Sequence, residues 1–225
     1  MRSVIVAIDG PAGAGKSTVS KAVADRLGLA LVDTGAIYRC VALAATRQAI
    51  AYDDDAALGV LLTGLEISFR FEAGVNRVLL NGEDVSDDIR APEISKAASA
   101  VSARPVVRAG LLELQRRFAR AAKDGAILEG RDIGTIVFPD AEVKFFVTAS
   151  DEVRAQRRFA ELQAKGVAMS FEQVLEEQRQ RDRDDSTRAL APLVPAKDAR
   201  LLDTSALGLD QVIEEIVRQV EKVRA

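Results

Sequence analysis

The fold is decided by one stretch of sequence, Gly10-Pro11-Ala12-Gly13-Ala14-Gly15-Lys16-Ser17. It follows the apolar run Val4-Ile5-Val6-Ala7-Ile8 and precedes a helical pattern from about Thr18 to Leu27. This G-x-x-x-x-G-K-[ST] spacing between a strand and a helix is typical of a phosphate-binding loop. Its glycines let successive N–H groups point at phosphate oxygens, and the helix directs its positive N-terminal end there. The stretch therefore predicts a nucleoside triphosphate site, in preference to a turn that only joins strand and helix.

Each residue type in this loop has a role in such a site. The Lys16 ammonium can reach the β- and γ-phosphates, and the Ser17 hydroxyl can ligate the Mg²⁺ that bridges them. The predicted ATP-binding residues of the loop are Gly10, Pro11, Ala12, Gly13, Ala14, Gly15, Lys16, Ser17 and Thr18.

Length and composition set limits on the class of protein. A chain of 225 residues with 48% hydrophobic residues is long enough to bury a substantial core. No run reaches the ~18 apolar residues of a membrane span, and the first strand begins too early for a signal peptide. The single cysteine, Cys40, indicates a reducing cytoplasm and is expected to be buried in a helix without chemistry. The net charge of −3 argues against a nucleic-acid partner, and we expect a monomer.

Two features of the composition bear on mechanism. Histidine is absent, which excludes imidazole bases and histidine-ligated metals. Arginine outnumbers lysine by 23 to 8 although the chain is net acidic. Bidentate guanidinium groups suit a phosphate-handling site, while scattered surface arginines are the alternative that accounts for most of them.

The rest of the chain alternates buried strands and helices. Each strand is followed by a helix, which predicts a doubly wound α/β domain with a five-stranded parallel sheet and helices on both faces. The strands are expected at 4–8, 29–32, 126–128, 143–147 and 200–203. The helices are expected at 18–27, 34–47 with Thr34 as N-cap, 54–62, 92–102, 105–122, from Asp151 to a break at Gly166, from a Ser170 cap through 185, and 209–223.

One region departs from this alternation. Apolar residues recur at every second position from Leu65 to Phe71, and a turn is expected at Gly74 and Asn76. Asn81-Gly82 is a strong hairpin signal. Residues from about 64 to 87 therefore predict a small antiparallel patch, which does not easily join a parallel sheet and is interpreted as an appended subdomain.

Other classes of phosphate-loop protein fit the sequence less well. A GTPase needs a guanine-reading motif after a late strand, and Pro195-Ala196-Lys197-Asp198 has the wrong spacing and precedes its strand. A mechanical ATPase would place an aspartate and a water-activating glutamate at the third strand, where Glu129 stands alone. Transfer to an acceptor that is itself a phosphate needs no general base, only crowded anions that are neutralised and held in line. An arginine-rich site without histidine suits this reaction.

Several motifs along the whole chain resemble those of the bacterial cytidylate kinase family, in which the antiparallel insert is also a signature. They are Asp33-Thr34-Gly35-Ala36-Ile37-Tyr38-Arg39, Gly82-Glu83-Asp84-Val85-Ser86 with Ile89-Arg90, Gly130-Arg131-Asp132-Ile133-Gly134-Thr135 with Val137-Phe138-Pro139-Asp140, and Ala191-Pro192-Leu193-Val194-Pro195. The resemblance implies a single P-loop kinase domain over residues 1–225. It also implies transfer of the γ-phosphate of ATP to CMP or dCMP, with Mg²⁺.

The resemblance also implies the roles of individual residues. Substrate contacts fall on Thr34, Arg39, Ser99, Arg108, Arg131, Asp132, Arg181 and Asp185. The resemblance implies that Lys16, Arg158 and Arg188 are catalytic and that Arg154 binds ATP. It also implies that Ser17 ligates Mg²⁺, with Glu129 in an outer shell. The insert, taken as 64–91, would serve the acceptor nucleotide, and 159–170 would form a lid that excludes water. Glu129 departs from the aspartate of some members, and Thr34 from their serine.

These residue types match the chemistry of cytosine. Asp132 and the Ser99 hydroxyl can accept from the amino group, while Arg108 donates to the ring acceptors. Uracil would oppose a carbonyl to the Asp132 carboxylate, and a closed site discriminates against such a mismatch by about 10⁴. Asp185 with Arg181 suits a ribose hydroxyl.

Some arginines and some functions keep an alternative interpretation. Arg154 could equally form a surface salt bridge, and Arg179 and Arg183 are expected on a solvated face paired with Asp182 and Asp184. The alternative functions are a kinase for UMP, a shikimate-like acid or a sugar acid, and a nucleotide-binding protein without turnover.

Overall fold

A computed structural model gives the structure of the chain and describes residues 3–72 and 75–225. The chain divides into two compact units. The first contains Met1–Val32 and Arg116–Ala225, and the second contains Asp33–Gln115. The predicted turn at Gly74 lies outside the described residues.

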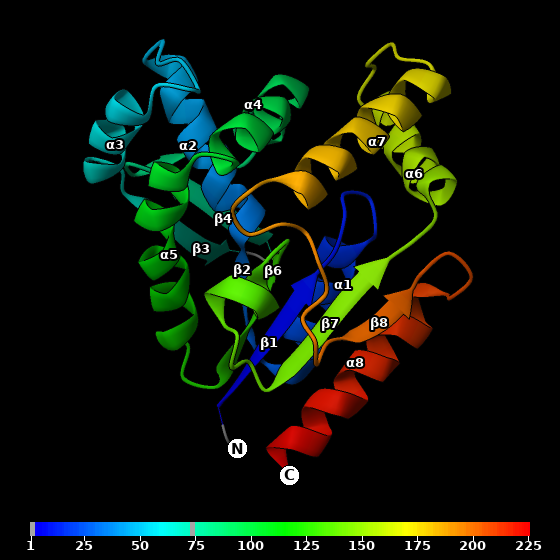
Figure 1. Ribbon diagram of the computed structural model, residues 1–225. Helices are drawn as coiled ribbons and strands as arrows, with labels where there is room; N and C mark the ends of the chain where they lie inside the picture. Colours follow the sequence, from blue (N-terminus) through cyan, green and yellow to red (C-terminus); the bar gives the residue numbers. More distant parts are fainter. Residues whose placement is uncertain (1–2, 73–74) are drawn as a thin grey trace. The chain divides into compact units, whose positions relative to one another are not determined.

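The first unit is built on a five-stranded parallel sheet with the strand order β2-β6-β1-β7-β8 (Figure 1). Its strands are β1 (Val4–Asp9), β2 (Ala30–Asp33), β6 (Gly125–Gly130), β7 (Val143–Thr148) and β8 (Arg200–Asp203). In the parallel register Asp9 pairs with Gly130 and with Phe146. The last residue of β1 is thus level with the last residue of β6 and lies two residues before the end of β7, so the loops that follow all three strands leave the sheet at its carboxyl edge.

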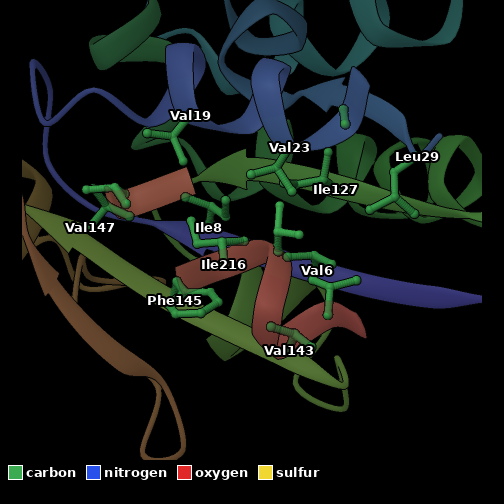
Figure 2. Packing of buried hydrophobic residues seen from close by; sticks show 14 of the residues in the cluster. Val6, Ile8, Val19, Val23, Leu29, Ile127, Val143, Phe145, Val147 and Ile216 are labelled. Atoms are coloured by element: carbon green, nitrogen blue, oxygen red, sulfur yellow. The ribbon is translucent and has the colours of Figure 1, made fainter. Parts of the chain in front are cut away.

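Four long helices complete this unit: α1 (Lys16–Leu27), α6 (Asp151–Ala164), α7 (Phe171–Thr187) and α8 (Leu209–Arg224). Helices α1 and α8 contact each other and the sheet. Figure 2 shows their apolar side chains, such as Val19, Val23 and Ile216, packed with Ile8 and Phe145 of the central strands. This buried cluster fixes the position of the loop between β1 and α1, because both flanking elements contribute to it.

Helices α6 and α7 lie side by side and have a small apolar cluster of their own (Figure 1). Ala155, Leu162 and Val174 are buried in it, and the rings of Phe159 and Phe171 meet edge to face at 6.1 Å. Ser170 begins α7 with a capping box, as the sequence predicts for its cap. The two helices therefore form a hairpin with its own core.

The second unit contains α2 (Thr34–Arg47), α3 (Asp55–Thr63), α4 (Pro92–Ser102) and most of α5 (Pro105–Arg120), which continues into the first unit. It also contains an antiparallel sheet of β3 (Ile67–Glu72), β4 (Val75–Leu80) and β5 (Glu83–Asp84), and a 3₁₀ turn at Asp88–Arg90. Asn81 and Gly82 both have positive φ, 51° and 84°, as the hairpin signal predicts.

The predicted fold class is confirmed, with two local differences. Strand β6 is followed by a π-helical turn at Ile133–Val137 and not by an α-helix. The N-cap of α2 is Asp33 and not Thr34, because the Asp33 carboxylate accepts from the Ala36 N–H at 2.9 Å. Cys40 is buried in α2, as expected, and burial raises the pKa of its thiol to about 12. Among the described helices, none combines the length and the apolar character needed to cross a membrane.

A pair of leucine truncations tests the packing of the sheet. Leu128 in β6 is fully buried, whereas Leu201 in β8 is 67% exposed. Leu128→Ala should lower the free energy of unfolding by ~2–5 kcal/mol, because it leaves a cavity as well as losing buried area. Leu201→Ala should change it by less than ~0.5 kcal/mol. Urea unfolding of both variants measures the difference, and equal effects would contradict this packing.

Candidate nucleotide-binding site

The loop from Gly10 to Gly15 has the backbone that its glycines predict. Gly10, Gly13 and Gly15 have φ of 147°, 75° and 90°, values that side chains strongly disfavour. A Cβ on Gly10 would lie 1.9 Å from the carbonyl oxygen of Val147 in β7. The loop therefore leaves β1 in contact with the neighbouring strand, and α1 begins at Lys16, two residues earlier than the sequence predicts.

The carbonyl groups of this loop, from Pro11 to Gly15, each accept a hydrogen bond. In chain order the donors are Lys16 Nζ (2.7 Å), Arg154 Nη1 (3.1 Å) together with Gln178 Nε2 (2.9 Å), Arg157 Nη1 (3.4 Å), Thr204 Oγ1 (3.2 Å) and the Val19 N–H (3.1 Å). In a trans peptide the C=O and N–H groups point in opposite directions. Side chains that hold the carbonyls therefore orient the N–H groups of the same peptides, and oriented N–H groups form an anion-binding site.

Lys16 is buried at the base of this loop. Burial and the neighbouring Arg131 guanidinium lower the pKa of Lys16 to about 7, while Glu129 and Asp9 act in the opposite direction. The ammonium is thus buried beside both like and opposite charges, and a phosphate group would favour its charged form further.

Ser17 and Glu129 are brought together, as a shared metal role requires. The Ser17 hydroxyl donates to Glu129 Oε2 at 2.7 Å, and Glu129 is buried at the end of β6. Hydroxyl and carboxylate oxygens are the ligands that Mg²⁺ prefers. Among residues 3–72 and 75–225, no group of three or more acidic, cysteine or histidine side chains could hold a metal by itself. This donor set fits a Mg²⁺ ion that takes its other ligands from phosphate and water.

Asp9 connects the phosphate loop to the segment that follows β6. It is 4% exposed, and its two carboxylate oxygens accept from the N–H groups of Ile133 and Gly134, both at 2.8 Å. Burial raises the pKa of Asp9 to about 6, against these two hydrogen bonds and Lys16, while the nearby Asp132 adds to the rise. The π-helical turn is thus tied to the start of the loop.

A second group of predicted site residues meets around Asp185 of α7. Arg131 Nε donates to Asp185 Oδ2 at 2.9 Å, and Arg188 Nη1 lies 3.6 Å from Oδ1. Burial alone would raise the pKa of Asp185, but Arg131, Arg181 and Arg188 hold it below its ordinary value. Asp132, next to Arg131, is buried as well. The structure therefore gathers a carboxylate and three guanidinium groups in the first unit.

Arg154 and Arg158, four residues apart in α6, have different surroundings. Arg154 is 3% exposed and donates to the Ala149 and Ala12 carbonyls and to Asp151, and it also pairs with Asp182 at 2.7 Å. Arg154 therefore forms salt bridges, as the alternative interpretation expects, but its side chain is buried and not at the surface. Arg158 pairs with Glu161 one turn along the same helix, at 3.1 Å.

Arg179 and Arg183 do not pair with the carboxylates that the sequence predicts for them. Arg179 pairs with Asp151 and Glu152, and Arg183 pairs with Glu176. The reason is that the carboxylates expected for them are taken by other side chains. Asp182 is held by Arg154, and Asp184 accepts from Gln180.

The second unit holds the other four predicted contacts. Thr34 is buried at the start of α2, and Arg39 Nη2 donates to Asp33 Oδ2 at 2.9 Å, close to the cap of that helix. Arg108 donates to the Ser102 carbonyl at 3.1 Å, and its guanidinium lies 5.7 Å from the centre of the Tyr38 ring. Ser99 lies half-buried in α4, and its carbonyl accepts from Ser102 Oγ.

Four residues that support the loop were missed by sequence reasoning. They are Asp9, Arg157, Gln178 and Thr204. Asp9 and Thr204 had a usable signal, because each is polar and stands at or just after the carboxyl end of a strand. Arg157 and Gln178 had none, since both lie on strongly polar helices.

The loop, its supporting side chains and the parallel sheet define a P-loop nucleotide-binding protein. The family model described as "Cytidylate kinase" matches residues 6–222 of the chain. The cytidylate kinase of Geobacter sulfurreducens is 54% identical over 98% of this chain and 95% of its own length. That of Pasteurella multocida is 45% identical over 97% and 96%. The chain belongs to the cytidylate kinase family.

A comparison with solved structures adds a likeness in fold. The crystal structure of an uncharacterized protein from Eubacterium ventriosum ATCC 27560 has a TM-score of 0.53 to this chain and covers 97% of it and 99% of its own length. The sequences are 11% identical, so this likeness shows the fold alone.

The raised pKa of Asp9 predicts a specific pH dependence of stability. Because its pKa is 3.8 when unfolded and about 6 in the folded chain, the folded state holds the proton more tightly. Its contribution is therefore present below pH ~4 and is lost as the pH rises to ~6, by roughly 3 kcal/mol in all. Asp9→Asn lacks this titration, so the stability of the wild type relative to Asp9→Asn should fall over that range.

Urea unfolding of both proteins between pH 4 and 7 measures this difference. Asp203→Asn is the control, because hydrogen bonds from Ser205 lower the pKa of Asp203, so its titration lies below the range tested and its curve should run nearly parallel to that of the wild type. Parallel curves for the wild type and Asp9→Asn would contradict the assignment.

Proposed function

We propose that this enzyme transfers the γ-phosphate of ATP to CMP, and also to dCMP, by direct in-line phosphoryl transfer. Membership of the cytidylate kinase family supports the reaction. The observation that carries it in the structure is the convergence of charge on Lys16. Arg131, Glu129 and Arg181 all act on its ammonium, so residues proposed for the donor and for the acceptor share one electrostatic environment.

The donor triphosphate is bound by the loop from Gly10 to Thr18. Oriented N–H groups donate to the phosphate oxygens, and Lys16 neutralises charge on the β- and γ-phosphates. Mg²⁺, held through Ser17 with Glu129 in its outer shell, would neutralise further charge on those phosphates. Arg154 is assigned to ATP binding because it donates to the Ala12 carbonyl and so helps to hold the loop.

The acceptor nucleotide is assigned residues from both units. In the first unit Arg131 suits the acceptor phosphate, Asp132 the cytosine amino group, and Arg181 with Asp185 a ribose hydroxyl. In the second unit the assigned residues are Thr34, Arg39, Ser99 and Arg108, with the insert at 64–91 serving the same nucleotide.

Catalysis is assigned to Lys16, Arg158 and Arg188. No residue has to remove a proton, because the attacking group is a phosphate oxygen, so positioning and charge neutralisation supply the rate. The lid at 159–170 comprises the last turns of α6 and the connection to α7, and the apolar cluster that the two helices share would let them move as one body and exclude water. We further propose that the enzyme acts as a cytoplasmic monomer without a nucleic-acid or membrane partner.

An acceptor panel tests the proposed specificity. ADP release is measured with ATP and CMP, dCMP, UMP or AMP as acceptor. CMP and dCMP should be turned over, and UMP should be slower by about 10³–10⁴ in kcat/KM because its O4 opposes the Asp132 carboxylate. Turnover of UMP at the rate of CMP would refute the role of Asp132. ATP binding without acceptor-dependent ADP release would favour a binding protein instead.

Replacing the loop lysine tests the donor site. Lys16→Ala should reduce kcat by at least about 10³, since it removes charge stabilisation from the transferring group, and should leave the Kd for CMP within about threefold. Lys21→Ala, on the exposed face of the same helix, is the matched control and should keep full activity. A Lys16→Ala enzyme with near-normal turnover would contradict the assignment.

A further inference from the structure

The Ala12 carbonyl of the phosphate loop receives two side-chain hydrogen bonds. Arg154 of α6 donates to it at 3.1 Å, and Gln178 of α7 donates through Nε2 at 2.9 Å. The peptide between Ala12 and Gly13 is therefore held by both helices of the α6–α7 hairpin.

The contact is too close to leave room for a side chain. A Cβ on Gly13 would lie 2.6 Å from Gln178 Nε2 and 3.1 Å from Arg154 Cβ, and Gly13 has a φ of 75°. The Gly13 N–H belongs to the same peptide as the Ala12 carbonyl, so it points away from the two side chains that donate to that carbonyl. In a P-loop the inward N–H groups bind phosphate oxygens.

We propose that Gln178 is a positioning residue for ATP, which fixes the Ala12–Gly13 peptide so that its N–H faces a phosphate group. The proposal rests on the proposed function for the identity of the ligands. It assigns Gln178 no contact with either substrate, because the side chain acts through the loop backbone.

The surroundings of Gln178 show no other structural role for its side chain. Its side chain is 7% exposed, and within the part of the chain that the structure describes its Oε1 has no hydrogen-bond partner. A buried amide with an unpaired oxygen contributes little to stability, since the missing bond offsets the one that is made. An apolar side chain of similar length should therefore leave the fold intact, and a role in ligand binding explains why a buried polar group stands here.

The position of Gln178 on α7 adds a second consequence. Arg181 and Asp185 follow it by three and seven residues, which places all three on the same face of the helix. Both are assigned to the acceptor nucleotide, whereas Gln178 contacts the donor loop. A nucleotide that fixes α7 through Arg181 and Asp185 will also fix the Ala12 carbonyl. CMP should therefore raise the affinity for ATP, and ATP should raise the affinity for CMP by the same factor.

The test compares Gln178→Met with a matched control, Gln180→Met. Gln180 lies on the exposed side of the same helix, where its amide donates to Asp184. Isothermal titration gives the Kd of the non-hydrolysable ATP analogue AMP-PNP, with magnesium, in the absence and presence of saturating CMP. Gln178→Met should weaken AMP-PNP binding about fivefold, as the loss of one hydrogen bond predicts, and should reduce the effect of CMP on that Kd. Gln180→Met should match the wild type in both.

Several results would overturn the proposal. An unchanged Kd for AMP-PNP in Gln178→Met removes the positioning role, and so does an equal loss of CMP affinity, which a general disturbance of the fold would produce. An unchanged effect of CMP removes the link through α7. Gln178→Glu is the second variant, because it keeps the length but loses the donor, and it should weaken AMP-PNP binding at least as much. If CMP does not bind the wild type at all, the proposed function fails and so does the link, while the AMP-PNP comparison still decides the positioning role.

Discussion

A phosphate loop can bind anions only while its carbonyl oxygens point away from the ligand. A peptide presents its carbonyl and its N–H on opposite sides, so each N–H offered to a phosphate needs a partner for the oxygen behind it. From Pro11 to Gly15 this condition is met by donors from α1, α6, α7 and the residue after β8. The glycine motif therefore specifies a backbone that the surrounding elements must complete.

Several buried charged groups surround the same loop. Lys16 is buried near Arg131 and Arg181, and these guanidinium groups favour the neutral amine. Asp9 and Glu129 oppose this effect but are themselves buried, and Asp9 is engaged with two backbone N–H groups. Arg131 is also paired with Asp185. A bound phosphate would add a further opposite charge beside the buried Lys16 ammonium, which favours the charged form of Lys16 where water is scarce.

The sequence predicted the elements whose signals are local. Helix α4 and strand β8 match the predicted ranges at both ends, because proline begins the helix and a short apolar run defines the strand. The Asn81-Gly82 turn and the Ser170 cap were also predicted correctly from local sequence signals. The turn at Ile133–Val137 was not predicted, and the Asp9 carboxylate that accepts from it lies 124 residues away from Ile133 in the sequence. The partners of Arg154 and Arg179 were also missed, because choices among several nearby carboxylates are made by tertiary packing.

Helix α7 shows how such packing can serve function. Its sequence is almost wholly polar and predicts a solvated face, yet Gln178 and Asp185 are buried on it. Apolar contacts hold only its first turns, through Val174 and Phe171 in the cluster shared with α6. Beyond them its position depends on hydrogen bonds to the loop and on the ion pairs of Asp185 with Arg131 and Arg188. Phosphate and ribose groups can compete for or reinforce such polar contacts far more readily than they can alter an apolar core. A helix held in this way has a defined position at its apolar end, and its polar end is the part on which the proposed nucleotide contacts would act.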